Sequence, residues 1–229
     1  MPFLKYSARY WGTHTKKDLS DNARTLALDL LNQHQDHISA VSLLEQVLHP
    51  SYIIATSLRF SGLHCASFFG IVELVTLLMN VEGCEIDRQD CTGSTPLAWA
   101  ARRGHEMVVK LLLEQEDVDP GCPDEDGNGP LGWAAVKRHV GVVKLLFERE
   151  DVDPNRPDKD GDGPLSWAAI KGDERVVKLF LKREDIDSNR QNKNSRTPLR
   201  WTAIEGKGGV AQLLLERQGR GGIVQPLQA

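Results

Sequence analysis

Four tryptophans recur along this chain at a constant step of 34 residues: Trp99, Trp133, Trp167 and Trp201. Four prolines keep the same step: Pro96, Pro130, Pro164 and Pro198. The surrounding sequence repeats as well, as STPLAWAARRGH, NGPLGWAAVKRH, DGPLSWAAIKGD and RTPLRWTAIEGK. A fixed period in this range is typical of stacked supersecondary units, each of which contacts only its neighbours. The repeat therefore predicts an elongated array, which offers surfaces for binding and no enclosed catalytic pocket.

Each copy carries the signals of two short helices joined by a tight turn. A helix start is predicted at Thr95, whose hydroxyl can cap the first turn, with proline following where its missing N–H costs nothing. Gly104 and its counterparts Gly172 and Gly206 predict the end of that helix in a left-handed residue. The third unit has Arg138 there, which should cost about 1 kcal/mol if the geometry is kept.

The rest of each unit reads as a second helix and a loop. Apolar residues at helical spacing, as in VVKLLL at 108–113, predict a second helix with one buried face. Segments rich in Asp, Pro and Gly, such as EDVDPGCPDEDGNG, predict the loops that connect the units.

This order of elements resembles the ankyrin repeat. The resemblance rests on TPLAWAARRGH…VVKLLLE with its copies, and on SGLHCASFFG…LVTLLM in the first unit. It implies an all-α solenoid with units at 61–94, 95–128, 129–162 and 163–196, a partial unit at 197–217 and a flexible tail at 218–229. The family's usual T-P-L-H keeps its histidine only at His64, and the step is one residue longer than usual.

Residues 1–60 contain further amphipathic patterns, NARTLALDLLNQ and ISAVSLLEQVL. Because exposed ends of a stack need capping, we expect a helical N-terminal cap or linker region here. YSARYWGTH…LALDLL followed by FSGLHCASFFG also resembles the segment that precedes the repeats in filamentous-fungal NACHT-ankyrin proteins, which are signalling ATPases of the STAND class. That resemblance implies a sensing arm. A stand-alone adaptor or transcriptional co-regulator is the alternative.

Composition narrows the class of partner and compartment. The formal net charge is -4, from 28 Lys and Arg against 32 Asp and Glu, which argues against direct nucleic-acid binding. No polybasic run, apolar span or signal-peptide pattern is present, so we expect no membrane binding and an intracellular location, cytoplasmic or nuclear. The four cysteines form no C-x-x-C pair, which favours a packing role.

The sequence lacks the common catalytic motifs and contains only part of one metal-binding pattern. No phosphate-binding G-x-x-x-x-G-K-[ST] loop, nucleophile motif or H-E-x-x-H pair occurs, so we expect no enzyme and no cofactor. The turns at 158–163 and 124–129 match D-x-D-x-D-G, the first half of an EF-hand loop, but alanine stands where the bidentate Glu belongs. A calcium-regulated protein is therefore only a remote alternative, and we expect no metal site.

The expected function is protein–protein interaction. In the family, the residues just before the terminating glycine face a concave groove, and here that position changes from apolar to basic to acidic along the array. The tryptophans could pack between first helices, line the groove as binding residues, or do both. The charges could form a solvated face, or they could suit a partner with an acidic or mixed patch and an apolar anchor. The apolar last helix (Val210, Leu213, Leu214, Leu215) could allow self-association. The candidate binding residues are Phe68, Phe69, Trp99, Arg102, Arg103, Trp133, Lys137, Arg138, Trp167, Lys171 and Trp201, with Asp126 and Asp160 in the loops.

Overall fold

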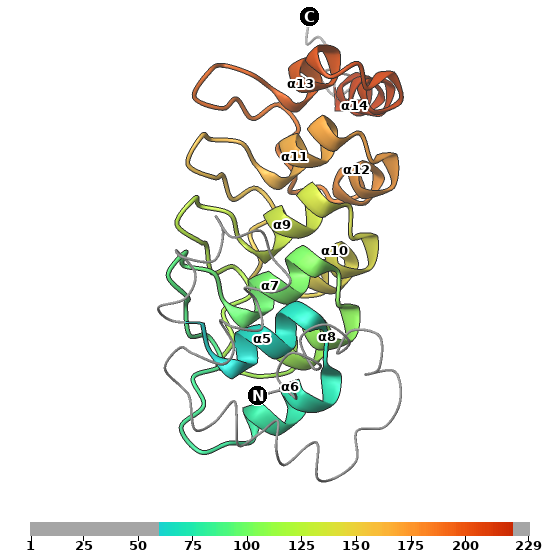
Figure 1. The fold of residues 1–229 in the computed structure, drawn as a ribbon. Coiled ribbons are helices and arrows are strands. Elements are labelled where there is room, and N and C mark those ends of the chain that lie inside the picture. Colours follow the sequence, from blue (N-terminus) through green and yellow to red (C-terminus); the bar gives the residue numbers. More distant parts are fainter. Residues whose placement is uncertain (1–59, 222–229) are drawn as a thin grey trace, which may run out of the picture.

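The computed structural model describes residues 60–221 as a stack of helix pairs (Figure 1). The first helices of the units are α5 (Gly62–Phe69), α7 (Pro96–Arg103), α9 (Pro130–Lys137), α11 (Pro164–Lys171) and α13 (Pro198–Ile204). The second helices are α6 (Val72–Met79), α8 (Glu106–Leu113), α10 (Val140–Phe147), α12 (Glu174–Leu181) and α14 (Gly208–Gly221). No strand occurs between residues 60 and 221, so the predicted all-α solenoid is confirmed.

The structure describes the two ends of the chain only in part. Helix α14 continues beyond Arg217 to Gly221, into the segment expected to be a flexible tail. The remainder of that tail, 222–229, lies outside the described residues. So does the predicted N-terminal cap, apart from Phe60.

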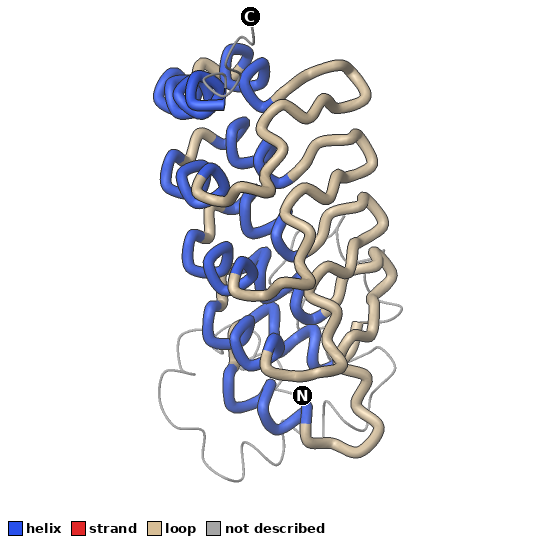
Figure 2. The backbone as a smooth tube through the Cα atoms, turned by 180° about the vertical axis from the view of Figure 1, so that it is seen from behind, coloured by secondary structure: helices blue, strands red, loops and turns tan. Residues whose placement is uncertain are grey.

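The helices form two rows, and the loops project from one side. The first helices lie between the loops and the second helices, as Figures 1 and 2 show from opposite sides. Paired alanines on the first helices, such as Ala100 and Ala101, are fully buried and let adjacent helices approach closely. The predicted apolar face of the second helices is buried against them, with Val108, Val109 and Leu112 at 0 % exposure.

The predicted turns between the two helices are confirmed, and their glycines have a steric reason. Gly104 has φ of 78°, in the left-handed region. A Cβ atom at Gly104 would also lie 2.5 Å from Nδ1 of His139 in the next unit, and one at Gly70 would collide with His105 in the same way. Each glycine therefore provides both the backbone conformation and the space for an imidazole.

Those imidazoles join consecutive units. Nε2 of His105 donates to the carbonyl of Phe68 over 2.9 Å, and Nε2 of His139 donates to the carbonyl of Arg102 over 3.2 Å. Each bond satisfies a carbonyl near the C-terminal end of the preceding first helix, which has no partner within its own helix. His105 and His139 therefore have a structural role in joining the units.

In the third unit Arg138 stands at the position of the turn glycine. It keeps the left-handed conformation, with φ of 65°. The following unit has Asp173 where the two preceding units have His105 and His139, and Asp173 instead caps its own helix α12 by accepting from the N–H groups of Arg175 and Val176. Because no imidazole lies over Arg138, its Cβ has room, and only the backbone strain remains.

This pairing predicts opposite effects of two substitutions. Gly104→Ala should lower the free energy of unfolding by about 2 kcal/mol, because it adds left-handed strain and a collision with His139. Arg138→Gly should raise it by a few tenths to about 1 kcal/mol, because it removes strain alone. Urea unfolding followed by tryptophan fluorescence measures both, and equal effects of the same sign would contradict the assignment.

Consecutive second helices are joined by three arginines for which the repeat pattern alone predicts no role. Arg149, Arg183 and Arg217 stand 34 residues apart, and Nη1 of each donates to a carbonyl at the end of the preceding second helix, at 2.8, 3.2 and 3.3 Å. Arg149 and Arg183 are held for this by Asp151 and Asp185, each at 2.7 Å. The bonds satisfy C-terminal carbonyls that an α-helix leaves without partners.

His64 is completely buried in the first unit. Its Nε2 donates to the carbonyl of Ser94 over 3.1 Å, and its Nδ1 accepts from the N–H of Ser61 over 3.1 Å. Burial lowers the pKa of His64 to about 4, because the charged imidazolium would lose its hydration.

The lowered pKa of His64 predicts a stability loss in mild acid. The unfolded chain binds a proton near pH 6.5, whereas folded His64 binds one only near pH 4. The contribution of neutral His64 to the free energy of unfolding is therefore fully present above pH 6.5. It is lost as the pH falls towards 4, by up to about 1.4 kcal/mol per pH unit. Urea unfolding between pH 7 and 4.5 should show a steeper loss for the natural chain than for His64→Gln. Parallel curves would contradict the prediction.

Candidate protein-interaction surface

The tryptophan ladder is tied to the loops by hydrogen bonds. Each indole Nε1–H donates to the aspartate nine residues earlier: Trp99 to Asp90, Trp133 to Asp124 and Trp167 to Asp158, at 2.8, 2.8 and 2.9 Å. The other carboxylate oxygen organises the turn, since Oδ1 of Asp124 accepts from the N–H groups of Asp126 and Asn128. One carboxylate thus fixes the loop tip and attaches it to the first helix.

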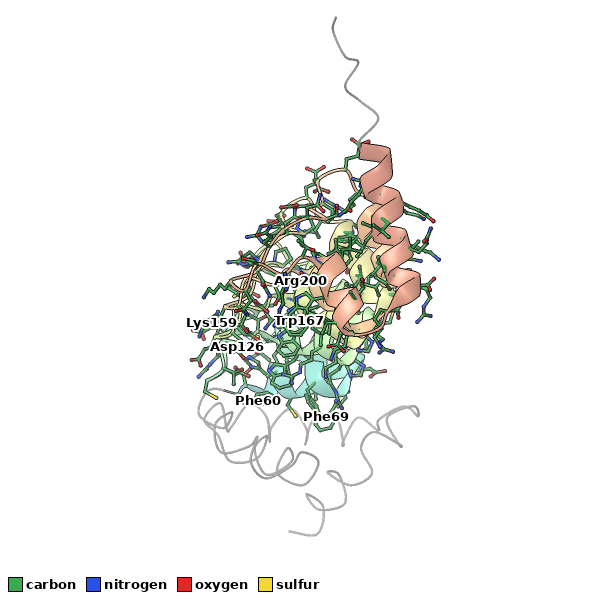
Figure 3. The ribbon with its side chains drawn as sticks, turned by 90° about the horizontal axis from the view of Figure 1, so that it is seen from above. Phe60, Phe69, Asp126, Lys159, Trp167 and Arg200 are labelled. Atoms are coloured by element: carbon green, nitrogen blue, oxygen red, sulfur yellow. The ribbon has the colours of Figure 1, made fainter. Side chains whose placement is uncertain are left out.

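The loop tips are also joined to one another. The N–H groups of Glu125, Lys159 and Lys193 donate to the carbonyls of Thr92, Asp126 and Asp160 in the preceding unit, at 2.8, 2.8 and 2.9 Å. Figure 3, which looks along the stack, shows Asp126 and Lys159 on the loop side and Trp167 closer to the helices. The loops therefore form a bonded row along the array.

The last unit keeps its indole bond by a different route. Asn192 replaces the aspartate, and its Oδ1 still accepts from the turn N–H groups of Asn194 and Arg196. The Trp201 indole instead donates to Oδ1 of Asp162 in the preceding unit, over 2.9 Å, and the Asn192 amide donates to the other oxygen of Asp162. The exchange at 192 is thus compensated by a carboxylate at 162.

This natural compensation predicts a rescue. Asp124→Asn should cost about 1 to 3 kcal/mol, because the indole of Trp133 loses its carboxylate acceptor. Adding Ser94→Asp, which occupies the position equivalent to Asp162, should recover part of that loss. The matched control is Asp126→Asn in the same turn, with an expected change below about 0.5 kcal/mol. Chemical unfolding of the natural chain, Asp124→Asn, Ser94→Asp, the double variant and the control measures the cycle, and additive effects of the two substitutions would argue against the exchange.

The indole rings differ in how accessible they are. Trp99 is 3 % exposed, whereas Trp133, Trp167 and Trp201 are partly exposed. Packing by tryptophan is therefore confirmed at Trp99, and the other three rings retain surface for contact. Arg102 lies against two of these rings, with its Cζ 5.1 Å from the Trp99 ring centroid and 4.0 Å from that of Trp133. Cation–π contact of this kind holds the planar guanidinium in place.

The aromatic pair at the N-terminal end of the face is divided between core and surface. Phe68 is 1 % exposed and Phe69 is partly exposed. Arg103 lies over the buried partner, with its Cζ 4.3 Å from the Phe68 ring centroid. Phe68 therefore supports the surface from below, and Phe69 presents apolar area at the end of α5, the position that Arg103 holds in α7.

Basic residues follow in the same position of the next units. Arg103, Lys137 and Lys171 are the last residues of the first helices in three successive units, and we call them the basic column. Burial lowers the pKa of Lys137, and the charges of Arg102, Lys171 and Arg103 lower it further. The cations are thus close enough to repel one another.

The basic column has no internal counterions in the described part of the chain. Ion pairs there join Arg149 to Asp151, Arg175 to Asp173, Lys178 to Glu174 and Arg183 to Asp185. Arg103, Lys137 and Lys171 take part in none of them. Glu205, at the equivalent place in the last unit, is exposed, as is Arg138 beside Lys137.

The acidic turns have structural donors for their carboxylates. Oδ1 of Asp158 accepts from the N–H groups of Asp160 and Asp162, its Oδ2 accepts from Trp167, and both oxygens of Asp162 are bonded as well. Among residues 60–221 no group of three or more acidic, histidine or cysteine side chains could hold a metal ion. These bonds account for the D-x-D-x-D-G pattern. Asp126 and Asp160 are exposed at the loop tips.

The C-terminal end of the array divides its apolar residues between core and surface. Val210 and Leu214 are 1 % exposed, whereas Leu215 of the same helix is 50 % exposed and Ile204 is 52 % exposed. No helix in the described range is long and apolar enough to cross a bilayer.

Comparison with known families agrees with this architecture. The family model for ankyrin repeats in three copies matches residues 63–158 and again 150–223. The chain therefore belongs to the ankyrin-repeat family, whose repeats generally serve as protein–protein interaction modules. No curated protein matches the chain.

Proposed function

We propose that this protein is a non-enzymatic interaction module that binds a partner protein through the first-helix surface and the loop tips. The observation that carries the proposal is the basic column of Arg103, Lys137 and Lys171, which has no ion pair among residues 60–221 and shares helices α9 and α11 with the partly exposed Trp133 and Trp167. Like charges held together raise the free energy of the unbound surface, and an oppositely charged partner relieves that repulsion.

Aromatic area supplies the second half of the surface. Phe69, Trp133 and Trp167 are partly exposed on the first helices α5, α9 and α11, and buried aromatic anchors dominate binding energies in many interfaces. The loop tips, with Asp126 and Asp160 exposed, extend the proposed surface to one side.

Two biological roles fit such a module. A sensing arm of a NACHT-ankyrin-like signalling protein is supported by the resemblance of 1–60 and the first unit to that class. A stand-alone adaptor or transcriptional co-regulator is the alternative. Self-association through the C-terminal end, where Ile204 and Leu215 are exposed, stays a prediction from the sequence.

The proposed surface predicts a charge-dependent partner. Affinity purification of the full chain from its native cell, read by mass spectrometry, should recover a partner that Arg103→Glu with Lys137→Glu no longer recovers. The physical reason is that each reversal turns an attraction into a repulsion, which costs about 1 kcal/mol or more per exposed contact.

A matched control separates position from net charge. Lys110→Glu with Lys144→Glu makes the same change in total charge on exposed residues of the second helices. That variant should keep the partner, and all three chains should have the same melting temperature. Loss of the partner from both variants, or from neither, would argue against the first-helix surface.

A further inference from the structure

The basic column sets a spacing for whatever binds it. Arg103, Lys137 and Lys171 stand one to a unit at a constant step of 34 residues, on first helices that pack directly on one another in the order α7, α9, α11. Packed helices lie about 8 to 10 Å apart, so the cations form a row with roughly that spacing. A complementary segment must present its negative charges at the same interval.

An extended left-handed conformation meets that interval. A polyproline II segment has three residues per turn and rises about 3.1 Å per residue, so every third side chain lies on one face about 9.3 Å from the last. A β-strand places residues i and i+3 on opposite faces. A heptad step in an α-helix advances about 10.5 Å, beyond the expected spacing. The helix repeat of this array therefore matches an acidic residue at every third position of an extended segment.

Arg103 of this row and its neighbour Arg102 both stack on aromatic rings. The guanidinium of Arg103 lies over Phe68, and that of Arg102 lies between the rings of Trp99 and Trp133. Stacking on Phe68 holds the guanidinium plane of Arg103 in place and reduces the entropy lost when it binds a carboxylate. The column ends at Phe69 on one side and at Glu205 on the other, which limits the acidic stretch to three contacts.

Resting on the proposed function, we infer that the basic column binds an extended, proline-rich acidic segment of a partner protein, with acidic residues at every third position. An apolar residue one further step along would meet Phe69. The partner is defined by this chemistry and spacing alone.

The test uses three peptides with the full chain. The first is proline-rich with three glutamates at every third position, the second has the same composition with the glutamates adjacent, and the third is an alanine-rich helix with glutamates at heptad steps. Fluorescence anisotropy of labelled peptides at low salt should show the first binding about tenfold or more tightly than the second, because only it can make all three contacts at once. Arg103→Glu with Lys137→Glu should abolish the preference, and Lys110→Glu with Lys144→Glu should leave it unchanged.

Other outcomes overturn the inference. Equal affinity of the first two peptides means that net charge, not spacing, governs binding. Tighter binding of the helical peptide means that the segment is not extended, and binding of none of the peptides means that the column is not a site for acidic segments. If the partner recovered from cells still depends on Arg103 and Lys137, the proposed surface survives any of these results. If that partner ignores the reversal, the surface itself is wrong.

Discussion

In each of the first three loops of this array, a single aspartate carboxylate accepts hydrogen bonds from both the backbone of the turn and a tryptophan indole. Buried or half-buried polar groups must find partners, and here the partners are supplied at fixed sequence distances. These bonds tie each loop to its first helix, and backbone hydrogen bonds between the loop tips extend that constraint to the next unit. The first-helix surface is therefore held rigid from the loop side, which is what a binding surface with a defined spacing requires.

Most of the fold could be predicted from the sequence, because it follows from local signals repeated with one period. Proline at the start of a helix, Gly104 at its end and VVKLLL in the second helix each specify a short element without reference to the rest of the chain. The exchange of carboxylates between Asn192 and Asp162 could not be predicted in this way, since it depends on two loops lying side by side. The Asp-x8-Trp and Arg149-Arg183-Arg217 spacings were present in the sequence, but their meaning depends on which carbonyl or indole lies opposite.

The sequence predicts which position of each repeat forms the candidate surface. It does not predict which side chains on that surface are accessible. The position before the terminating glycine could be read from the repeat, which gave Arg103, Lys137 and Lys171. Whether an aromatic ring at a neighbouring position is exposed depends on its packing, and Phe68 and Trp99 prove to be buried while Phe69 and Trp133 are partly exposed. Sequence spacing does not contain that distinction, because it is decided by contacts between units.

The pairing of Gly70 and Gly104 with the histidine of the next unit means that the units are not equivalent as genetic modules. The second unit could be duplicated in tandem without conflict, since Gly104 would lie beneath the histidine of its own copy. A tandem duplication of the third unit would place the side chain of Arg138 beneath a copy of His139, where no Cβ fits. Recombination that duplicates or exchanges units is therefore compatible with the packing at some unit boundaries and incompatible at another. The side chain of Arg138 makes that difference.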